Sequence, residues 1–288
     1  MKFYSVTAIL LVISTIMVSG CTDTNDGTPA VKNNEIVILE NVEAVPNEIK
    51  PDRNFAVSGF VTNKAAAKTS NVQISLADYC SSVFDVSKTS CALTQSNGYS
   101  ACFFDLNLDA SKKFQWDFKA PPASRTAGQD FDCNIIVKTN YSYTSHGSVG
   151  VVLANDAEIA ARENGPAPVT GDGPVKIHIT VDSAQPIGKD ETFDVKIILK
   201  NEGEGELEGS ISEGNFKYTA PPDFTGSCDT PAEIIISDAS KESDPFYCTF
   251  TTPNLLPPRV TKFITADVVY SYKFTTMLPV KLKVTKQS

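Results

Sequence analysis

The sequence predicts an all-β fold made of two tandem antiparallel β-sandwiches that follow an N-terminal signal segment. Two observations predict it. Strand-like alternation of apolar and polar residues recurs from Glu35 onward, and the second half of the chain repeats residues of the first half in the same order. Apolar residues make up 41% of the 288 residues, which is enough to build hydrophobic cores.

The alternation is clearest in the second half. Val175, Ile177, Ile179 and Val181 are separated by polar residues, and the stretches 193–199 and 278–284 follow the same pattern. A period of two is typical of a strand with one face on a core. Helical character is confined to 156–162, and the following Gly-Pro-Ala-Pro ends it.

These patterns divide the mature chain into three parts. The first sandwich is expected over residues 35–154 and the second over 174–288, with a linker over 155–173 between them.

The two halves match at three successive offsets. A shrinking offset indicates loop deletions in the second copy, where loops vary most. Matches 138 positions apart are Phe55, Val57 and Asn63 with Phe193, Val195 and Asn201; matches 132 apart are Phe114, Phe118 and Pro121 with Phe246, Phe250 and Pro253; matches 129 apart are Ile135, Val137, Tyr141 and Tyr143 with Ile264, Ala266, Tyr270 and Tyr272. We interpret the pattern as a tandem duplication.

Each copy holds seven or eight short strands, which favours sandwiches of the immunoglobulin-like type. The run from Phe193 through Lys200-Asn201 to Gly203 and Gly205 resembles the CARDB-like and related immunoglobulin-like modules of archaeal and bacterial surface proteins. In those modules a hydrophobic strand ends in Asn before a Gly-containing turn. The resemblance implies extracellular spacing or adhesion and carries no catalytic residues.

The first twenty residues have the build of a signal peptide. Lys2 precedes an apolar stretch over 6–18, which is shorter than the ~20 residues that a membrane-spanning helix needs. The closing Val18-Ser19-Gly20-Cys21 resembles the lipobox of prokaryotic lipoproteins, which implies cleavage after residue 20 and a lipid on Cys21. The alternative is an ordinary signal that is discarded with Cys21. Residues 21–34 are polar and are expected to form a flexible tether.

The cysteine count supports the lipid anchor. Seven cysteines leave six once Cys21 is set aside. Disulfides are the default in an oxidising compartment. We expect one bond between Cys228 and Cys248. The first half holds Cys80, Cys91, Cys102 and Cys133, which allow three connectivities that the sequence does not distinguish.

Composition excludes some partners. The formal net charge is −9 and the pI is about 4.8, so nucleic acid and anionic lipid are not bound by bulk electrostatics. No nucleic-acid partner is expected.

No motif indicates catalysis, a metal or a cofactor, so we expect a protein that is not an enzyme. His146 is expected in a hairpin turn and His178 on the outer face of a strand, and neither has neighbours at metal-ligand spacing. The alternating Glu202, Glu204, Glu206 and Glu208 raise the question of calcium, but a solvated sheet edge is the simpler interpretation.

Two further features have alternative interpretations. Tyr141, Tyr143, Tyr270 and Tyr272 could form a binding platform, although their parity favours core packing. Asn140 begins an Asn-Tyr-Ser sequon and is expected to face solvent, either glycosylated or as a plain outward Asn.

The sequence therefore predicts an exported protein, anchored by a lipid on Cys21 to the outer face of the cell membrane. It would act without catalysis in adhesion, envelope structure or a surface assembly, with another surface protein or a glycan as its partner. The alternative is a carbohydrate- or solute-binding lipoprotein with a cleft between the two domains.

Overall fold

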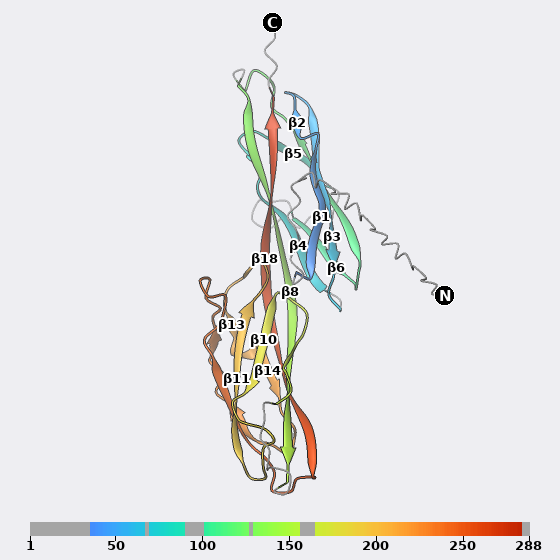
Figure 1. Ribbon diagram of the computed structural model, residues 1–288. Coiled ribbons are helices and arrows are strands. Elements are labelled where there is room, and N and C mark those ends of the chain that lie inside the picture. Colours follow the sequence, from blue (N-terminus) through green and yellow to red (C-terminus); the bar gives the residue numbers. More distant parts are fainter. Residues whose placement is uncertain (1–34, 67–68, 90–100, 127–128, 156–164, 284–288) are drawn as a thin grey trace, which may run out of the picture. The chain divides into compact units, whose positions relative to one another are not determined.

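The computed structural model describes residues 35–66, 69–89, 101–126, 129–155 and 165–283 (Figure 1). The described residues form β-strands and one three-residue 3-10 helix, Glu213–Asn215, so the prediction of an all-β sandwich fold is confirmed. None of the helical structure in these ranges is long and apolar enough to cross a membrane. The signal segment, the tether with Cys21, Cys91 and the helical stretch expected over 156–162 lie outside the described residues.

Two four-stranded antiparallel sheets have the same internal order, one in each half of the chain. In the first half the order is β1 (Val37–Val45), β3 (Asn54–Asn63), β7 (Ser111–Lys119) and β5 (Asp85–Thr89). In the second half it is β10 (Val175–Val181), β11 (Thr192–Asn201), β17 (Phe246–Thr251) and β15 (Thr225–Cys228).

A third, eight-stranded sheet contains strands from both halves. Its path is β12 (Glu206–Leu207), β18 (Arg259–Leu282), β8 (Phe131–Ala154), β4 (Thr69–Asp78) and β6 (Ala101–Leu106). Three short strands pair at its sides, β14 (Phe216–Thr219) and β2 (Glu48–Ile49) on β18, and β9 (Val169–Thr170) on β8. A separate two-stranded sheet joins β13 (Ile211–Ser212) to β16 (Glu233–Ile234).

The centre of the eight-stranded sheet is a single antiparallel ladder between β8 and β18. Both strands are 24 residues long, and they pair without a register shift from Arg259 opposite Ala154 to Leu282 opposite Phe131. Figure 1 shows the green β8 and the red β18 side by side along this ladder. Alternating apolar residues bury one face of each strand, as expected for half-buried strands.

Each end of this ladder belongs to a different sandwich. In the first sandwich, β4 pairs with the early residues of β8, and β2 pairs with the end of β18. In the second sandwich, β14 pairs with the early part of β18, and β9 pairs with the later part of β8. The two layers meet in aromatic contacts such as Tyr79, directly after β4, with Phe118 in the first sandwich and Phe216 with Phe246 in the second.

The sheet pairing thus crosses the linker expected over residues 155–173. The distal half of β8 lies in the second sandwich, and the distal half of β18 lies in the first. The domain boundaries drawn from the sequence stay a prediction, but the two sandwiches share a sheet.

One local expectation is wrong. The hairpin turn expected around His146 does not form, because His146 lies inside β8 and pairs with Asp267 of β18. The polar residues 144–148 that suggested a turn continue the strand, with Ser145 and Gly147 buried and His146 exposed.

Candidate functional site

Four tyrosines lie at the midpoint of the β8–β18 ladder, where the two sandwiches meet. Tyr141 pairs with Tyr272 and Tyr143 with Tyr270, on either side of the Ser142–Ser271 pair. The ring centroids of Tyr141 and Tyr272 are 5.6 Å apart, and those of Tyr143 and Tyr270 are 6.4 Å apart. Tilted and edge-on contacts at these distances are favourable for aromatic pairs. We call these four residues the tyrosine junction.

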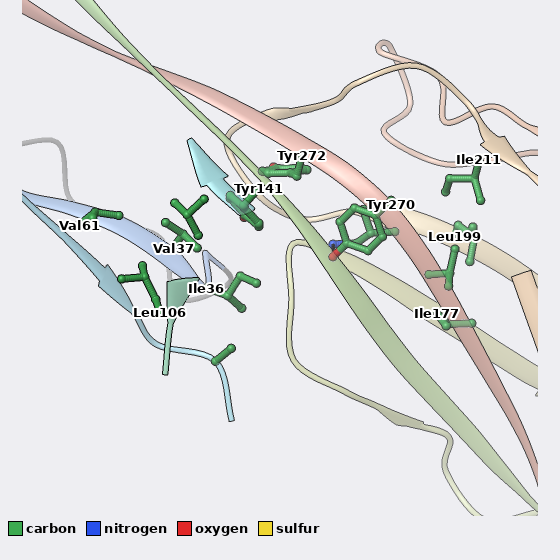
Figure 2. Close-up of a cluster of buried hydrophobic side chains, with 14 of the residues drawn as sticks. Ile36, Val37, Val61, Leu106, Tyr141, Ile177, Leu199, Ile211, Tyr270 and Tyr272 are labelled. Atoms are coloured by element: carbon green, nitrogen blue, oxygen red, sulfur yellow. Dashed lines mark hydrogen bonds between the residues drawn. The ribbon is translucent and has the colours of Figure 1, made fainter. Parts of the chain in front are cut away.

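Three of the four tyrosines are almost completely buried. Tyr272 is 0% exposed, Tyr141 2% and Tyr270 4%. Figure 2 shows them beside the ladder, between apolar residues of the first sandwich such as Val37 and Leu106 and residues of the second such as Ile177 and Leu199. The tyrosines therefore pack as a core and offer no open platform.

Glu35 is the polar centre of the tyrosine junction. Its carboxylate accepts hydrogen bonds from the Tyr141 hydroxyl at 3.1 Å and from the Tyr272 hydroxyl at 3.3 Å. It also accepts the backbone N–H of Glu204 at 2.8 Å. One side chain thus joins β8, β18 and the loop after β11.

The remaining hydroxyl partners come from both halves. The Tyr272 hydroxyl also lies 3.1 Å from Asn201 Oδ1, and the amide of Asn201 donates to the carbonyl of Gly205 at 2.8 Å. The Tyr270 hydroxyl lies 2.9 Å from Ser145 Oγ and accepts the backbone N–H of Val175 at 3.3 Å. Buried hydroxyls in the tyrosine junction are therefore hydrogen-bonded, as buried polar groups require.

The surroundings keep these phenols protonated. Burial raises the pKa of Tyr141 well above its usual range, and the Glu35 carboxylate raises it further. Burial followed by Glu35 also raises the pKa of Tyr272. Burial is the main cause of the raised pKa of Tyr270 and of Tyr143. A neutral phenol with a raised pKa is a hydrogen-bond donor and a poor general base at neutral pH.

The glutamates after β11 do not gather into a calcium loop. Three of the carboxylates instead lie near separate nitrogen atoms, at N–O distances of 3.7 to 3.8 Å: His178 Nε2 for Glu202, Lys273 Nζ for Glu206 and Lys138 Nζ for Glu208. Across the described ranges, no three His, Cys, Asp or Glu side chains lie close enough together to hold a metal ion.

The two histidines lie on different sheets. The exposed His146 places Nδ1 2.6 Å from Asp267 Oδ1, its neighbour across the ladder. His178 lies on β10, half-buried, with Nε2 3.7 Å from Glu202 Oε1. The structure does not bring the two histidines into one cluster.

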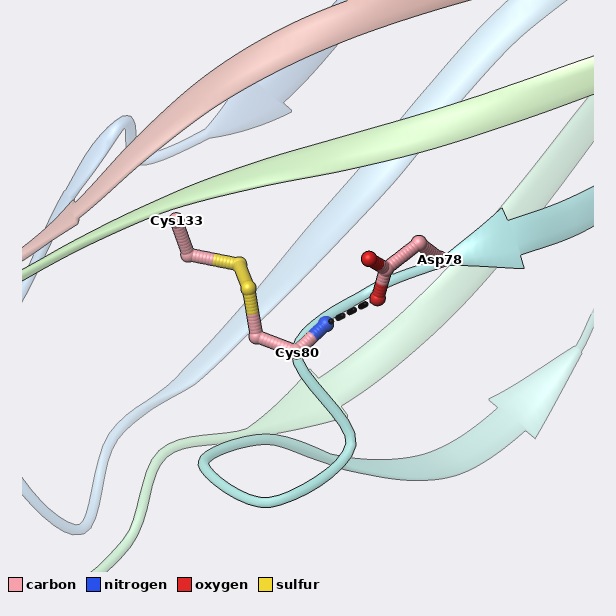
Figure 3. The surroundings of a disulfide bond; sticks show 3 residues. All are labelled: Asp78, Cys80 and Cys133. Atoms are coloured by element: carbon pink, nitrogen blue, oxygen red, sulfur yellow. Dashed lines mark hydrogen bonds between the residues drawn. A yellow bond between two sulfur atoms is a disulfide. The ribbon is translucent and has the colours of Figure 1, made fainter.

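The disulfides are structural links inside each half. Cys80, in the loop that follows β4, is bonded to Cys133 on β8, and its backbone N–H donates to Asp78 Oδ1 (Figure 3). Cys228 is bonded to Cys248, its direct neighbour across β15 and β17. Cys102 is fully buried on β6 and also belongs to a disulfide. The Cys80–Cys133 bond is one of the pairings that the sequence left open for the first half.

Asn140 lies in the middle of the eight-stranded sheet, between Gln73 of β4 and Lys273 of β18. It is half-buried, and its Oδ1 atom is buried without a hydrogen-bond partner. As expected from the sequence, Asn140 lies on the opposite face of β8 from the buried Tyr141. Neighbouring strands flank its side chain on both sides.

Sequence reasoning missed Glu35, which it treated only as the start of the first sandwich. The duplication gives no signal for it, because the residue 138 positions later is Gly173. Gly173 has a φ of +107° and lies against Tyr143, where any β-carbon would be 2.8 Å from the ring. The two copies therefore contact the tyrosine junction in different ways.

The fold and the tyrosine junction define a disulfide-bonded β-sandwich protein in which two sandwiches share one sheet. No family model matches the chain, and no curated protein matches it. Among solved structures, the collagen adhesin (CNA) from S. aureus aligns over 84% of this chain and 82% of that chain, with 8% identity and a TM-score of 0.14. Similarity this low carries no information about how the present chain acts.

Proposed function

We propose that this chain is an exported, lipid-anchored surface protein that acts through non-catalytic interaction, in adhesion, envelope structure or as an accessory subunit of a surface assembly. The lipid would be carried by Cys21. A diacylglyceryl group supplies two acyl chains, and two membrane signals are what stable anchoring requires.

The disulfides are the observation that supports an exported protein best. Bonds join Cys80 to Cys133 and Cys228 to Cys248, and Cys102 is oxidised as well. Disulfides of this kind persist in oxidising environments and are rare where cellular thiols are kept reduced. The folded region therefore suits the outer side of a membrane.

The chemistry of the tyrosine junction supports interaction over catalysis. The hydroxyls of Tyr141, Tyr270 and Tyr272 are buried, hydrogen-bonded and kept protonated, so they hold the two sandwiches together. The alternative function, a sugar or solute site between the domains, would need open aromatic side chains there. Three of the four tyrosines at this position are buried, and Tyr143 is partly buried and packs against the core, which counts against that alternative.

Contacts with a partner would come from exposed loops of the sandwiches. Leu255, in the segment between β17 and β18, is 85% exposed, although large apolar side chains are normally buried. Replacing Leu255→Asp should reduce cross-linking of the full protein to its neighbours on the native envelope. Leu108→Asp makes the same change in a loop of the first sandwich, where Leu108 is 55% exposed, and shows which sandwich carries the contact.

Membrane fractionation tests the anchor. The Cys21→Ser protein should be exported and recovered in the soluble fraction, whereas a Thr22→Ala control should stay with the membrane. Mass spectrometry of the natural protein should find the lipid on Cys21. A Cys21→Ser protein that still fractionates with membranes would disprove lipid anchoring through this residue.

A further inference from the structure

The duplication seen in the sequence is also a repeat in strand pairing. The bounds of β3 and β11 differ by 138 positions at both ends. In the first half Val37 pairs with Asn63, and in the second Val175 pairs with Asn201. Both asparagines accept a hydrogen bond from the backbone N–H two residues later. The same structural unit is therefore built twice, once in each half of the chain. We call the two copies the first and the second unit, as distinct from the two sandwiches, which share strands of both.

The long strands of the two units face each other about a two-fold relation. Ser142 of β8 and Ser271 of β18 stand 129 positions apart, the offset of the repeat, and they are paired with each other. Tyr141 faces Tyr272, and its own repeat equivalent, Tyr270, faces Tyr143. In an isologous, two-fold interface, a residue on the axis lies opposite its own copy.

Each long strand extends beyond its own unit and completes the other. At the end of β18, Leu282 pairs in parallel with Ile49 of the first unit. At the end of β8, Leu153 pairs in parallel with Ile187 of the second unit. These two contacts are repeat equivalents, because Leu153 and Leu282 differ by 129 positions and Ile49 and Ile187 by 138. The exchange is reciprocal.

We infer that the two repeat units of this chain exchange strands with each other, as two subunits do in a strand-exchanged dimer. Each unit is an incomplete sandwich whose binding partner is the complementary unit, which supplies the second half of a 24-residue strand. The linker between the units is not what holds them together. The interface consists of the uninterrupted β8–β18 ladder, the tyrosine junction and the two strand ends.

Gly147 makes this interface specific for the complementary unit. A β-carbon on Gly147 would lie 2.8 Å from the β-carbon of Ile177 and 3.0 Å from its backbone oxygen. The repeat equivalent of Gly147 in β18 is Thr276. A second copy of β18 placed on β10 would bring a branched side chain into this space. The second unit therefore accepts β8 and rejects a copy of its own strand.

Cutting the linker of the folded chain tests the exchange. A protease recognition sequence inserted between the exposed Ala167 and Pro168 allows cleavage after the full chain has folded. The two fragments should co-elute in size-exclusion chromatography at the mass of the uncut protein, and should separate only in denaturant. Fragments that separate in native buffer while each keeps its β-sheet circular dichroism would overturn the inference.

A substitution at Gly147 tests its specificity. Gly147→Thr introduces the residue of the equivalent position and should make the cleaved fragments dissociate at least ten-fold more readily than the cleaved natural sequence. Gly214→Thr is the matched control, because a β-carbon there has no atom within 4 Å. If the cleaved fragments of both variants dissociate equally readily, Gly147 does not determine the pairing. The cut chain without substitution tests the exchange even if Gly147→Thr does not fold.

Discussion

Lys262 occupies in the second unit the position that Cys133 occupies in the first, 129 residues earlier. Cys133 is bonded to Cys80, whereas Lys262 forms an ion pair with the Asp223 carboxylate and lies 5.9 Å from the ring of Phe224. The residue at this position of the long strand is thus linked to a loop residue by a covalent bond in the first unit and by an ion pair in the second.

The difference predicts unequal costs for breaking the two links. The Cys80–Cys133 bond closes 53 residues, so a Cys80→Ala/Cys133→Ala protein should lose about 4 kcal/mol on the loop-entropy model. Lys262→Met should lose less than about 1 kcal/mol, as is usual for an exposed ion pair. Urea unfolding of both variants measures the two losses. Equal losses would contradict the prediction.

The Asp223 carboxyl should make stability depend on acid pH. The hydrogen bond from Lys262 lowers the pKa of Asp223 in the folded protein. The stabilisation is therefore present above the unfolded pKa of about 3.9 and is lost as the pH falls through the lower folded value. The stability difference between the natural protein and Lys262→Met should shrink as the pH falls below about 4. A difference independent of pH would argue against this role of Asp223.

The tyrosine junction should make the protein unfold in alkali. The folded pKa values of Tyr141, Tyr270 and Tyr272 are raised, so the unfolded chain loses its phenolic protons first. The contribution of these groups is complete below the unfolded value of about 10 and is lost as the pH rises above it. Absorbance at the phenolate band should rise together with the loss of β-sheet signal. Ionisation of all tyrosines in a still folded protein would contradict this prediction.

Removing Glu35 should loosen the tyrosine junction. In Glu35→Ala the hydroxyl of Tyr141 loses its acceptor, and a buried hydroxyl without a partner costs about 1–3 kcal/mol. Thermal unfolding, followed by near-ultraviolet circular dichroism of the tyrosines, measures the effect. Glu43→Ala is the control, because Glu43 is exposed on β1. The expectation fails if the two variants melt at the same temperature.

The second unit should not fold alone as a monomer. A protein of residues 174–288 keeps β18 but lacks β8, which pairs with all 24 of its residues. A strand of this length without its neighbour exposes a row of unpaired backbone groups and is prone to aggregation. Size-exclusion chromatography and circular dichroism of the fragment test this. A monomeric, cooperatively unfolding fragment would show that β8 is dispensable.

Much of the fold followed from local patterns. Alternation at Val175–Val181 and Phe193–Leu199 located β10 and β11, and the parity of Tyr141 and Tyr272 placed both rings in a core. Such patterns report which face of a strand is buried. They do not report which strand lies alongside, so the exchange of β8 and β18 between the sandwiches was not predictable from alternation.

The missed features have specific causes. The polar run around His146 imitates a turn because this part of β8 has an exposed face and a buried Gly147 that packs against Ile177. Glu35 meets its partners only through tertiary structure, since Tyr141 and Tyr272 lie 106 and 237 residues away. The partner of Cys80 is likewise set by the β4–β8 pairing.

The positions of Glu35 and Leu282 decide how the molecule responds to tension. Residue 35 is held at the tyrosine junction, and Leu282 pairs with Ile49 of the first sandwich. A pull between these two points therefore acts along the strands of the first sandwich, and the second sandwich is attached to the pulled region through the β8–β18 ladder and the Glu35–Glu204 hydrogen bond. In a simple row of domains, by contrast, every domain bears the whole force. Here the second sandwich can keep its shape and its contacts while the first is stretched.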